Sequence, residues 1–256
     1  MISYASMMEV DEGDMRNAFA HVDSWVFDLD DTLYPRSIGI HQQLKQRVVL
    51  FIANHLKIDH AAAEAVHLDY YDRFGATLQG LVELHGVVPR AFLDFIHDID
   101  LSVLTRNSAL IAGLQALPGR RVVFTNASRG HAAAVLNAMG LLDLFDAVGS
   151  IEDCDFVGKP HPSAFSGFFD ANGIDPAASA MFDDRVGNLI VPCQLGMKTV
   201  LVVEPLVGAR ERFEKPRHVD VVISDIAAFL RKLAISEREV SRTVRCVPNV
   251  RGSFNK

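Results

Sequence analysis

Hydrophobic and polar positions follow two different patterns along the chain. Residues 25–27 form a short apolar run that ends in Asp28, and apolar runs of similar length recur from residue 121 onward. Short runs of this kind, closed by polar residues, predict buried strands. We therefore expect a first strand ending at Asp28 and further strands at residues 122–125, 147–151, 180–183, 199–203 and 219–223.

The stretch between the first two strands has a helical pattern instead. From residue 37 to 117 the apolar residues recur every three or four positions, which predicts amphipathic helices at residues 40–56, 61–74, 78–85 and 90–99. Gly86 fits the end of one helix and Pro89 the first turn of the next. Further helices, expected at residues 131–139, 162–172, 186–195 and 226–233, alternate with the later strands.

Alternation of strands and helices predicts parallel strands joined by crossover connections, with helices on both faces of the sheet. The sequence thus predicts an α/β fold, a doubly wound Rossmann-like parallel sheet interrupted after its first strand by a helical cap. We assign residues 18–35 and 118–235 to the α/β core and residues 36–117 to the cap. Residues 1–17 and 236–256 are expected to be flexible.

Composition narrows the function classes. The 256 residues carry a formal net charge of -7, which argues against a nucleic-acid-binding surface, since such a surface needs a basic face. Three widely spaced cysteines indicate neither a zinc site nor a disulfide framework. No apolar stretch is long enough to span a bilayer, and the N-terminus lacks the features of a signal peptide. We expect a cytoplasmic protein whose partner is a small molecule, not a nucleic acid or a membrane. Its oligomeric state is open.

Four polar clusters follow the predicted strands at their carboxyl ends or in the loops beyond. They are Asp28-Leu29-Asp30, Thr125-Asn126, Lys159 and Asp183-Asp184. In an open parallel sheet the carboxyl ends share one crevice, where ligands bind. Residues two apart on an extended segment point the same way, so Asp28 and Asp30 converge there. Because neighbouring carboxylates are costly unless a cation or a proton separates them, the pair implies a metal.

These side chains complement one another in phosphoryl transfer. A carboxylate can attack phosphorus to form an acyl phosphate, and a neighbouring acid can protonate the departing alkoxide and later activate water. A hydroxyl, an amide and an ammonium group can bind the phosphoryl oxygens. The remaining carboxylates can hold Mg²⁺, which prefers oxygen ligands and screens the nucleophile from an anionic substrate.

Between residues 25 and 203 the motifs DxDx(T/V), Ser/Thr, Lys and an acidic pair occur in that order, and this combination resembles the haloacid dehalogenase-like hydrolase superfamily. The resemblance implies that Asp28 is the nucleophile and Asp30 the general acid/base. It also implies that the phosphoryl group is bound by Thr125, Asn126 and Lys159.

The same resemblance implies a set of metal ligands and supporting residues. Mg²⁺ is expected at Asp28, Asp183, Asp184 and the backbone carbonyl of Asp30, with Asp184 the more direct ligand of the acidic pair. Thr32 and Asn188 are expected to support the site. Tyr34 and Arg36, which lead from the first motif toward the cap, are candidate substrate contacts.

Shorter pieces resemble the pyrimidine 5′-nucleotidase branch of this superfamily. They are FDLDDTLYP, GIHQQLKQRV, TNASRGHA, LLDLFD and FDDRVGNL, with residues 70–75 and 80–81. That branch carries a helical cap directly after the first motif. The resemblance implies a Mg²⁺-dependent phosphomonoesterase that acts on a pyrimidine nucleoside 5′-monophosphate, UMP or CMP.

Other functions stay open from the residues alone. The same motifs would serve a phosphatase for a sugar phosphate, phosphoglycolate or pyridoxal phosphate, a sugar-phosphate mutase, or a non-catalytic phosphate-binding module. Asp30 favours phosphoryl transfer over dehalogenation, because cleavage of a carbon–halogen bond needs no general acid two residues after the nucleophile. The DxD motif of glycosyltransferases does not account for the later motifs.

Two residue types outside the motifs could be mistaken for ligands. Tyr70, Tyr71 and Phe74 could stack on a nucleobase, but aromatic residues at helical spacing are expected to pack within the cap. The ten histidines show no metal-binding spacing, so most are expected at the surface or at its boundary.

Overall fold

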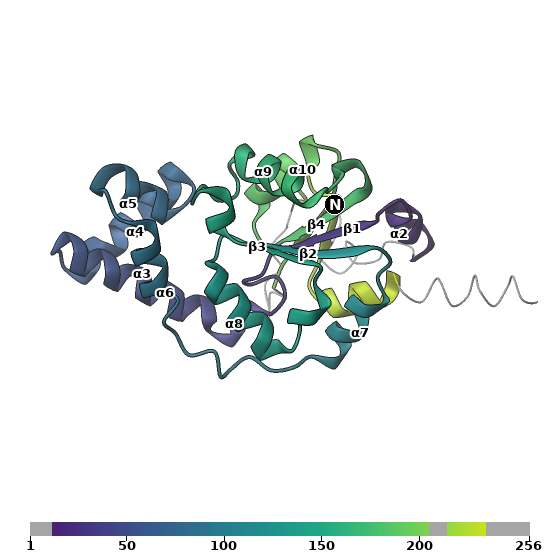
Figure 1. Cartoon of the computed structure of the whole chain (residues 1–256), viewed down its shortest axis with the longest axis horizontal. Helices are drawn as coiled ribbons and strands as arrows, with labels where there is room; N and C mark the ends of the chain where they lie inside the picture. The colour runs from purple at the N-terminus through teal and green to yellow at the C-terminus, as the bar shows by residue number, and fades with distance from the viewer. Residues whose placement is uncertain (1–11, 205–213, 234–256) are drawn as a thin grey trace, which may run out of the picture.

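The computed structural model describes residues 12–204 and 214–233. Six parallel strands within them form one sheet in the order β3-β2-β1-β4-β5-β6 (Figure 1). The strands are β1 (Ser24–Phe27), β2 (Arg120–Phe124), β3 (Ala147–Gly149), β4 (Ser179–Asp183), β5 (Lys198–Val202) and β6 (Val221–Ile223). The strand order reverses between β1 and β4, and such a reversal opens a crevice at the carboxyl ends of the strands. The predicted doubly wound α/β fold is confirmed.

Helices cover both faces of the sheet because side chains alternate along its strands. Trp25 and Phe27 of β1 belong to one buried cluster, whereas Val26 belongs to another. The first cluster is completed by α7 (Ser108–Ala116), α8 (Arg129–Met139) and a helix over residues 226–233. The second is completed by α9 (Pro162–Asn172) and α10 (Ile190–Gln194). In Figure 1 these two groups of helices lie on opposite sides of the strands.

Four helices between β1 and β2 stand apart from the sheet (Figure 1). They are α3 (Ile40–Leu56), α4 (His60–Phe74), α5 (Thr77–His85) and α6 (Pro89–Ile96). Most of their buried side chains, among them Ile52, Leu81 and Phe92, form a third cluster, which also includes Ile151. We refer to α3–α6 as the inserted helices. No helix among the described residues is long and apolar enough to cross a membrane.

The ends of the inserted helices follow from local sequence. α3 begins after Gly39, whose φ of 93° suits a residue without a side chain. α4 begins after Asp59, which caps it by accepting the Ala62 N–H at 2.8 Å. Gly86, with φ 63°, ends α5, and Pro89 occupies the first turn of α6, as predicted. Local capping therefore separates four short helices that pack against one another.

The structure departs from the expected boundaries in two places. α7 lies within the range 36–117 assigned to the cap, but Leu110 and Leu114 pack in the same cluster as Phe27, so this helix belongs with the sheet. Residues 12–17 were expected to be flexible, yet α2 (Glu12–Phe19) is a helix that buries Met15 in that cluster. The expected flexibility of residues 1–11 and 236–256 lies outside the described residues.

Candidate active site

The candidate site lies where β1, β2 and β4 end. Asp28 follows β1, and its backbone N–H donates to the Phe182 carbonyl at 2.8 Å, which extends the strand pairing by one residue. Thr125 follows β2 in the same way and donates its backbone N–H to the Gly149 carbonyl at 3.0 Å. Asp183 is the last residue of β4. The structure thus brings these three side chains to one edge of the sheet.

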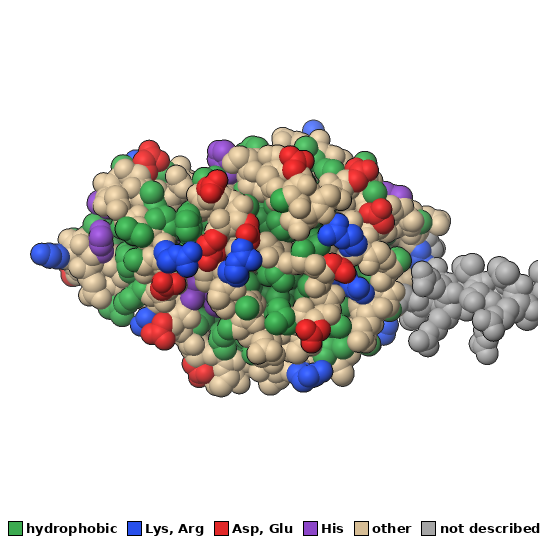
Figure 2. Space-filling model, viewed as in Figure 1, with side chains coloured by type: hydrophobic (Ala, Val, Ile, Leu, Met, Phe, Trp, Pro, Cys, Tyr) green, Lys and Arg blue, Asp and Glu red, His purple; other side chains and the backbone are tan. Residues whose placement is uncertain are grey.

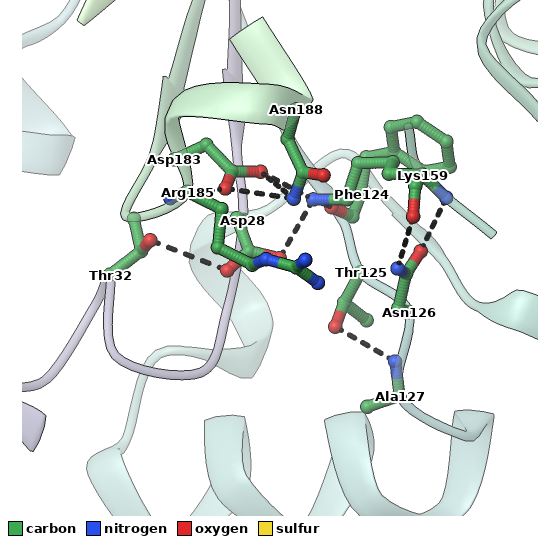
Figure 3. A network of polar contacts seen from close by, with 10 residues as sticks. All are labelled: Asp28, Thr32, Phe124, Thr125, Asn126, Ala127, Lys159, Asp183, Arg185 and Asn188. Carbon is green, nitrogen blue, oxygen red and sulfur yellow. Dashed lines mark hydrogen bonds and ion pairs between the residues drawn. The ribbon is translucent and has the colours of Figure 1, made fainter. Parts of the chain in front are cut away.

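Lys159 occupies the centre of this edge (Figure 3). Its buried ammonium donates to Asp28 Oδ1 at 2.8 Å, to Asp183 Oδ2 at 2.8 Å and to the Phe124 carbonyl at 2.7 Å. All three N–H groups therefore have acceptors, as a buried ammonium requires. Burial would lower the pKa of Lys159, but the charges of Asp183 and Asp28 outweigh it and raise that pKa. Lys159 stays charged and holds together two carboxylates that would otherwise repel.

Asn126 holds the loop that carries Lys159. Its Oδ1 accepts the Lys159 backbone N–H at 2.7 Å, and its Nδ2 donates to the Lys159 carbonyl at 2.8 Å (Figure 3). The side chain was predicted to bind phosphate, but both of its polar atoms are engaged by the Lys159 backbone. These contacts position the lysine, and phosphate binding by Asn126 stays a prediction.

Asp28, Asp183 and Asp184 form an acidic cluster, in which one oxygen of each carboxylate lies within 4.8 Å of the others. Burial raises the pKa of Asp28 to about 7; the charge of Lys159 opposes this rise and that of Asp183 adds to it. Burial, reinforced by the charges of Asp28 and Asp183, raises the pKa of Asp184 to about 8. Crowded carboxylates with raised pKa values have the chemistry of a divalent-cation site, since a cation would relieve their repulsion.

Asn188 supports this cluster through Asp183 (Figure 3). Its Nδ2 donates to both oxygens of Asp183, at 2.9 and 3.1 Å. Asp183 Oδ1 also accepts the Arg185 backbone N–H at 2.9 Å, so the carboxylate is fixed in orientation. Asn188 Oδ1 is buried and has no hydrogen-bond partner among the described residues. That acceptor beside the acidic cluster leaves room for a further donor, which fits a hydrated cation.

Asp30 lies in a different environment from Asp28. His131 Nε2 lies 2.9 Å from Asp30 Oδ1, and the Tyr34 hydroxyl donates to the same oxygen. Burial would raise the pKa of Asp30, but the charge and hydrogen bond of His131 and the hydrogen bond of Tyr34 outweigh it and lower that pKa. Two carboxylates at one site thus have pKa values shifted in opposite directions, that of Asp28 upward and that of Asp30 downward.

Three other predicted residues, Thr32, Tyr34 and Arg36, differ in what their side chains contact. Thr32 Oγ1 donates to Asp28 Oδ2 at 3.3 Å, which supports the nucleophile as expected of it. Tyr34 was a candidate substrate contact, but its side chain is buried and its hydroxyl is bound to Asp30, so it supports the acid instead. Arg36 is exposed, and its Nε lies 3.8 Å from Asp31 Oδ2. The same carboxylate oxygen lies 3.0 Å from His41 Nδ1. Arg36 stays a candidate contact.

His131 is a site residue that the sequence interpretation missed. The histidines were expected mostly at the surface, but this side chain is fully buried in the first turn of α8. A signal was present in the piece TNASRGHA. His131 stands three residues after Ser128, the residue that caps α8, and the start of α8 follows the predicted phosphate-binding Thr125.

The inserted helices meet the core beside the acidic cluster. The Arg185 guanidinium lies 4.4 Å from the centre of the Tyr71 ring on α4. Burial raises the pKa of the Tyr71 phenol against the opposing charge of Arg185. Tyr70 and Phe74 pack within the inserted helices as expected, whereas Tyr71 is 42% exposed. Figure 2 shows acidic and basic side chains gathered at this junction.

Carboxylates at the end of a central parallel strand, held by a lysine from a later loop, define a class of Rossmann-like hydrolases. Residues 22–190, more than half of the chain, match the sequence family described as haloacid dehalogenase-like hydrolase. The chain belongs to this family.

A curated protein is similar to much of this chain. Phosphate metabolism protein 8 of Saccharomyces cerevisiae is 27% identical over 192 residues, which cover 68% of this chain and 60% of that protein. The match thus spans less than two thirds of the length of the curated relative.

Solved structures share the fold. A HAD phosphatase from Thermococcus onnurineus aligns with a TM-score of 0.56 at 19% identity, covering 83% of this chain and 97% of that one. L-2-haloacid dehalogenase from Xanthobacter autotrophicus, with chloropropionic acid covalently bound, aligns with a TM-score of 0.53 at 17% identity, covering 82% and 97%. Both phosphatases and dehalogenases therefore have this fold, and the reaction has to be argued from the site.

Proposed function

We propose that the protein is a metal-dependent phosphomonoesterase that hydrolyses a small phosphate ester through an aspartyl phosphate on Asp28. The observation that carries the proposal is the contrast between two carboxylates. Asp28 is held by Lys159 within an acidic cluster, whereas Asp30 has hydrogen-bond donors of its own in Tyr34 and His131. A dehalogenase needs the first carboxylate but not a separately oriented acid two residues later.

The acidic cluster fits a bound Mg²⁺. All candidate ligands are oxygens, which a hard cation prefers, and Asp28, Asp183 and Asp184 converge within 4.8 Å. The backbone carbonyl of Asp30 is the proposed further ligand. When bound, such an ion supplies positive charge that screens Asp28 from the anionic substrate and neutralises charge on the phosphoryl oxygens.

The proposed reaction has two steps. In the first, an oxygen of Asp28 attacks phosphorus in line while Asp30 gives its proton to the leaving alkoxide, which departs as an alcohol. In the second, Asp30 takes a proton from water, which attacks phosphorus and releases inorganic phosphate and the Asp28 carboxylate. The Thr125 hydroxyl binds one phosphoryl oxygen, and the Lys159 ammonium exchanges one of its three protein acceptors for another.

The proposed substrate is a pyrimidine nucleoside 5′-monophosphate, UMP or CMP. The sequence resemblance supports this choice, and so does the half-exposed Tyr71 ring at the junction between the inserted helices and the core. Next to Arg185, the ring offers a planar surface on which a nucleobase can stack. Free thiols at Cys154 and Cys193 are consistent with the proposed place of action, the cytoplasm.

A phosphate-release screen over nucleoside monophosphates, sugar phosphates, phosphoglycolate and pyridoxal phosphate tests the proposal. We expect Mg²⁺-dependent release of phosphate in step with substrate loss, with UMP and CMP among the better substrates. Asp28→Asn should abolish turnover, whereas Asp170→Asn on the exposed face of α9 should not. Activity only on other esters would reject the pyrimidine substrate, and substrate loss without phosphate release would indicate a mutase. A folded protein inactive on every ester would overturn the proposal.

A further inference from the structure

A buried histidine lies behind the proposed general acid. The His131 side chain has no exposed surface, and its Nε2 lies 2.9 Å from Asp30 Oδ1. The Tyr34 hydroxyl binds the same oxygen, while Asp30 Oδ2 has no hydrogen-bond partner among the described residues. The Asp30 side chain keeps 25% of its surface exposed. One carboxylate oxygen is therefore held, and the other is left free.

The difference between the two carboxylate oxygens determines which of them can carry a proton. Oδ1 already accepts from two donors, so a proton on the acid has to sit on Oδ2. Two donors on one oxygen also limit rotation of the carboxylate, which otherwise turns freely about its terminal bond. A general acid works only within hydrogen-bond reach of the atom that it protonates, so holding this orientation matters for the reaction.

Packing alone does not account for His131. Its Nδ1 is buried without a partner among the described residues, and burying an unpaired polar atom is costly. A leucine in the same place would fill the space without that cost. The contact that offsets the cost is the one from Nε2 to Asp30.

A second histidine, His97, holds His131 from the side of the inserted helices. It follows α6 directly, and its ring stacks on that of His131 with 4.3 Å between centres and 23° between planes. Ser128 Oγ lies 2.9 Å from His97 Nδ1 and accepts the His131 backbone N–H at 3.2 Å. Burial, with the nearby His131, lowers the pKa of His97 to about 3, so its ring packs uncharged.

We propose that His131 is a positioning residue that holds Oδ1 of Asp30 and so leaves Oδ2 as the oxygen that exchanges protons with the leaving group and with water, with His97 linking this contact to the inserted helices. The inference rests on the proposed phosphomonoesterase function. It adds to that function a role for His131, which does not contact the substrate.

The test uses leaving groups of different quality. A poor alkoxide leaving group depends on protonation, whereas 4-nitrophenolate leaves readily without it. We expect His131→Leu to lower kcat for UMP by about 10- to 100-fold, within the usual contribution of general acid catalysis, and kcat for 4-nitrophenyl phosphate by less than about threefold. His131→Gln, whose amide N–H can replace Nε2, should recover most of the loss. His97→Ala should also lower the ratio of kcat for UMP to kcat for 4-nitrophenyl phosphate, but by a smaller factor.

Controls separate this role from a structural one. His67→Leu removes a half-buried histidine that binds Thr77 within the inserted helices, and it should leave the ratio of the two kcat values unchanged. Thermal unfolding shows whether each variant is folded. Equal losses on both substrates, no rescue by Gln, or unchanged kcat for UMP in a folded His131→Leu protein would overturn the proposal. If the wild-type protein hydrolyses neither ester, the proposed function itself fails, and the role of His131 fails with it.

Discussion

The ammonium of Lys159 lies 2.8 Å from the carboxylate of Asp28, and both side chains are buried. This contact joins a loop after β3 to the end of β1, across 131 residues of sequence. It is part of the fold as well as of the site, because Lys159 also binds Asp183 and the Phe124 carbonyl. The same side chain can therefore be tested through stability and through activity.

Replacing Lys159 by methionine should destabilise the protein strongly. Methionine fills a similar volume but leaves two buried carboxylates without their cation, and breaking a buried ion pair by removing one partner costs about 3–5 kcal/mol. Without the lysine, the folded-state pKa of Asp28 rises further above that of the unfolded chain. The loss of stability should therefore be larger at pH 8 than at pH 5, where the Asp28 carboxyl can hold a proton.

Chemical denaturation at the two pH values measures this effect. Lys198→Met serves as the control, because Lys198 is partly exposed and lies 3.8 Å from Asp220, so its loss should change stability by less than about 1 kcal/mol. A loss for Lys159→Met that is equal at both pH values would show that the buried carboxylates do not depend on the lysine charge.

Mg²⁺ should stabilise the protein more at pH 8 than at pH 6. In the metal-free protein the pKa values of Asp28 and Asp184 are raised to about 7 and about 8. Folded-state values above those of the unfolded chain mean that the folded protein keeps protons that the unfolded chain has lost. The stability of the metal-free protein therefore falls as pH rises from about 4 to 8. A cation competes with those protons, so it binds more tightly as they leave.

Thermal unfolding with and without MgCl₂ at the two pH values measures this dependence. The rise in Tm on adding Mg²⁺ should be larger at pH 8, and Asp184→Asn should reduce it. Asp170→Asn, on the exposed face of α9, should leave it unchanged. Equal rises at both pH values would argue against carboxylates with raised pKa values as the ligands.

The sequence predicts which strand ends meet, for a simple reason. Parallel strands all end at one edge of the sheet, so Asp28, Thr125 and Asp183 had to lie close together once the strands were identified. The boundaries of α3 and α9 also follow from periodicity with their Gly and Pro end signals, and both match the prediction.

Side-chain contacts across the fold could not be predicted in this way. Tyr34 is only four residues from Asp30, but whether its hydroxyl turns to the acid or to the substrate depends on a rotamer that packing decides. His131 is 101 residues from Asp30, and no periodic pattern joins them. α7 has the same apolar spacing as the inserted helices, so periodicity could not show that Leu110 packs against the sheet.

Tyr71→Ala should weaken binding of nucleotides without slowing the chemical step. The loss of a stacking surface costs about 1 kcal/mol or more, so KM for UMP should rise by about fivefold or more while kcat changes little. KM for ribose 5-phosphate, which lacks a base, should stay the same. Tyr71→Phe keeps the ring and should behave like the wild type.

Leu68→Ala, also exposed on α4, is the matched control for this prediction and should affect neither KM. Steady-state kinetics with UMP and with ribose 5-phosphate gives kcat and KM for each ester. A rise in KM for both esters alike would mean that Tyr71 places the inserted helices and does not contact the base.

Gly158→Ala should damage the site through the loop that carries Lys159. A Cβ at this position would lie 2.6 Å from Asn126 Oδ1 and 2.7 Å from its Cγ, and Asn126 holds the Lys159 backbone. We expect a loss of about 1–3 kcal/mol in stability and a lower kcat, measured by denaturation and phosphate release. Gly167→Ala, within α9, should instead stabilise by about 0.5–1 kcal/mol, because the added Cβ would have no atom within 4 Å. Unchanged kcat in Gly158→Ala would show that Lys159 keeps its place without the Asn126 contact.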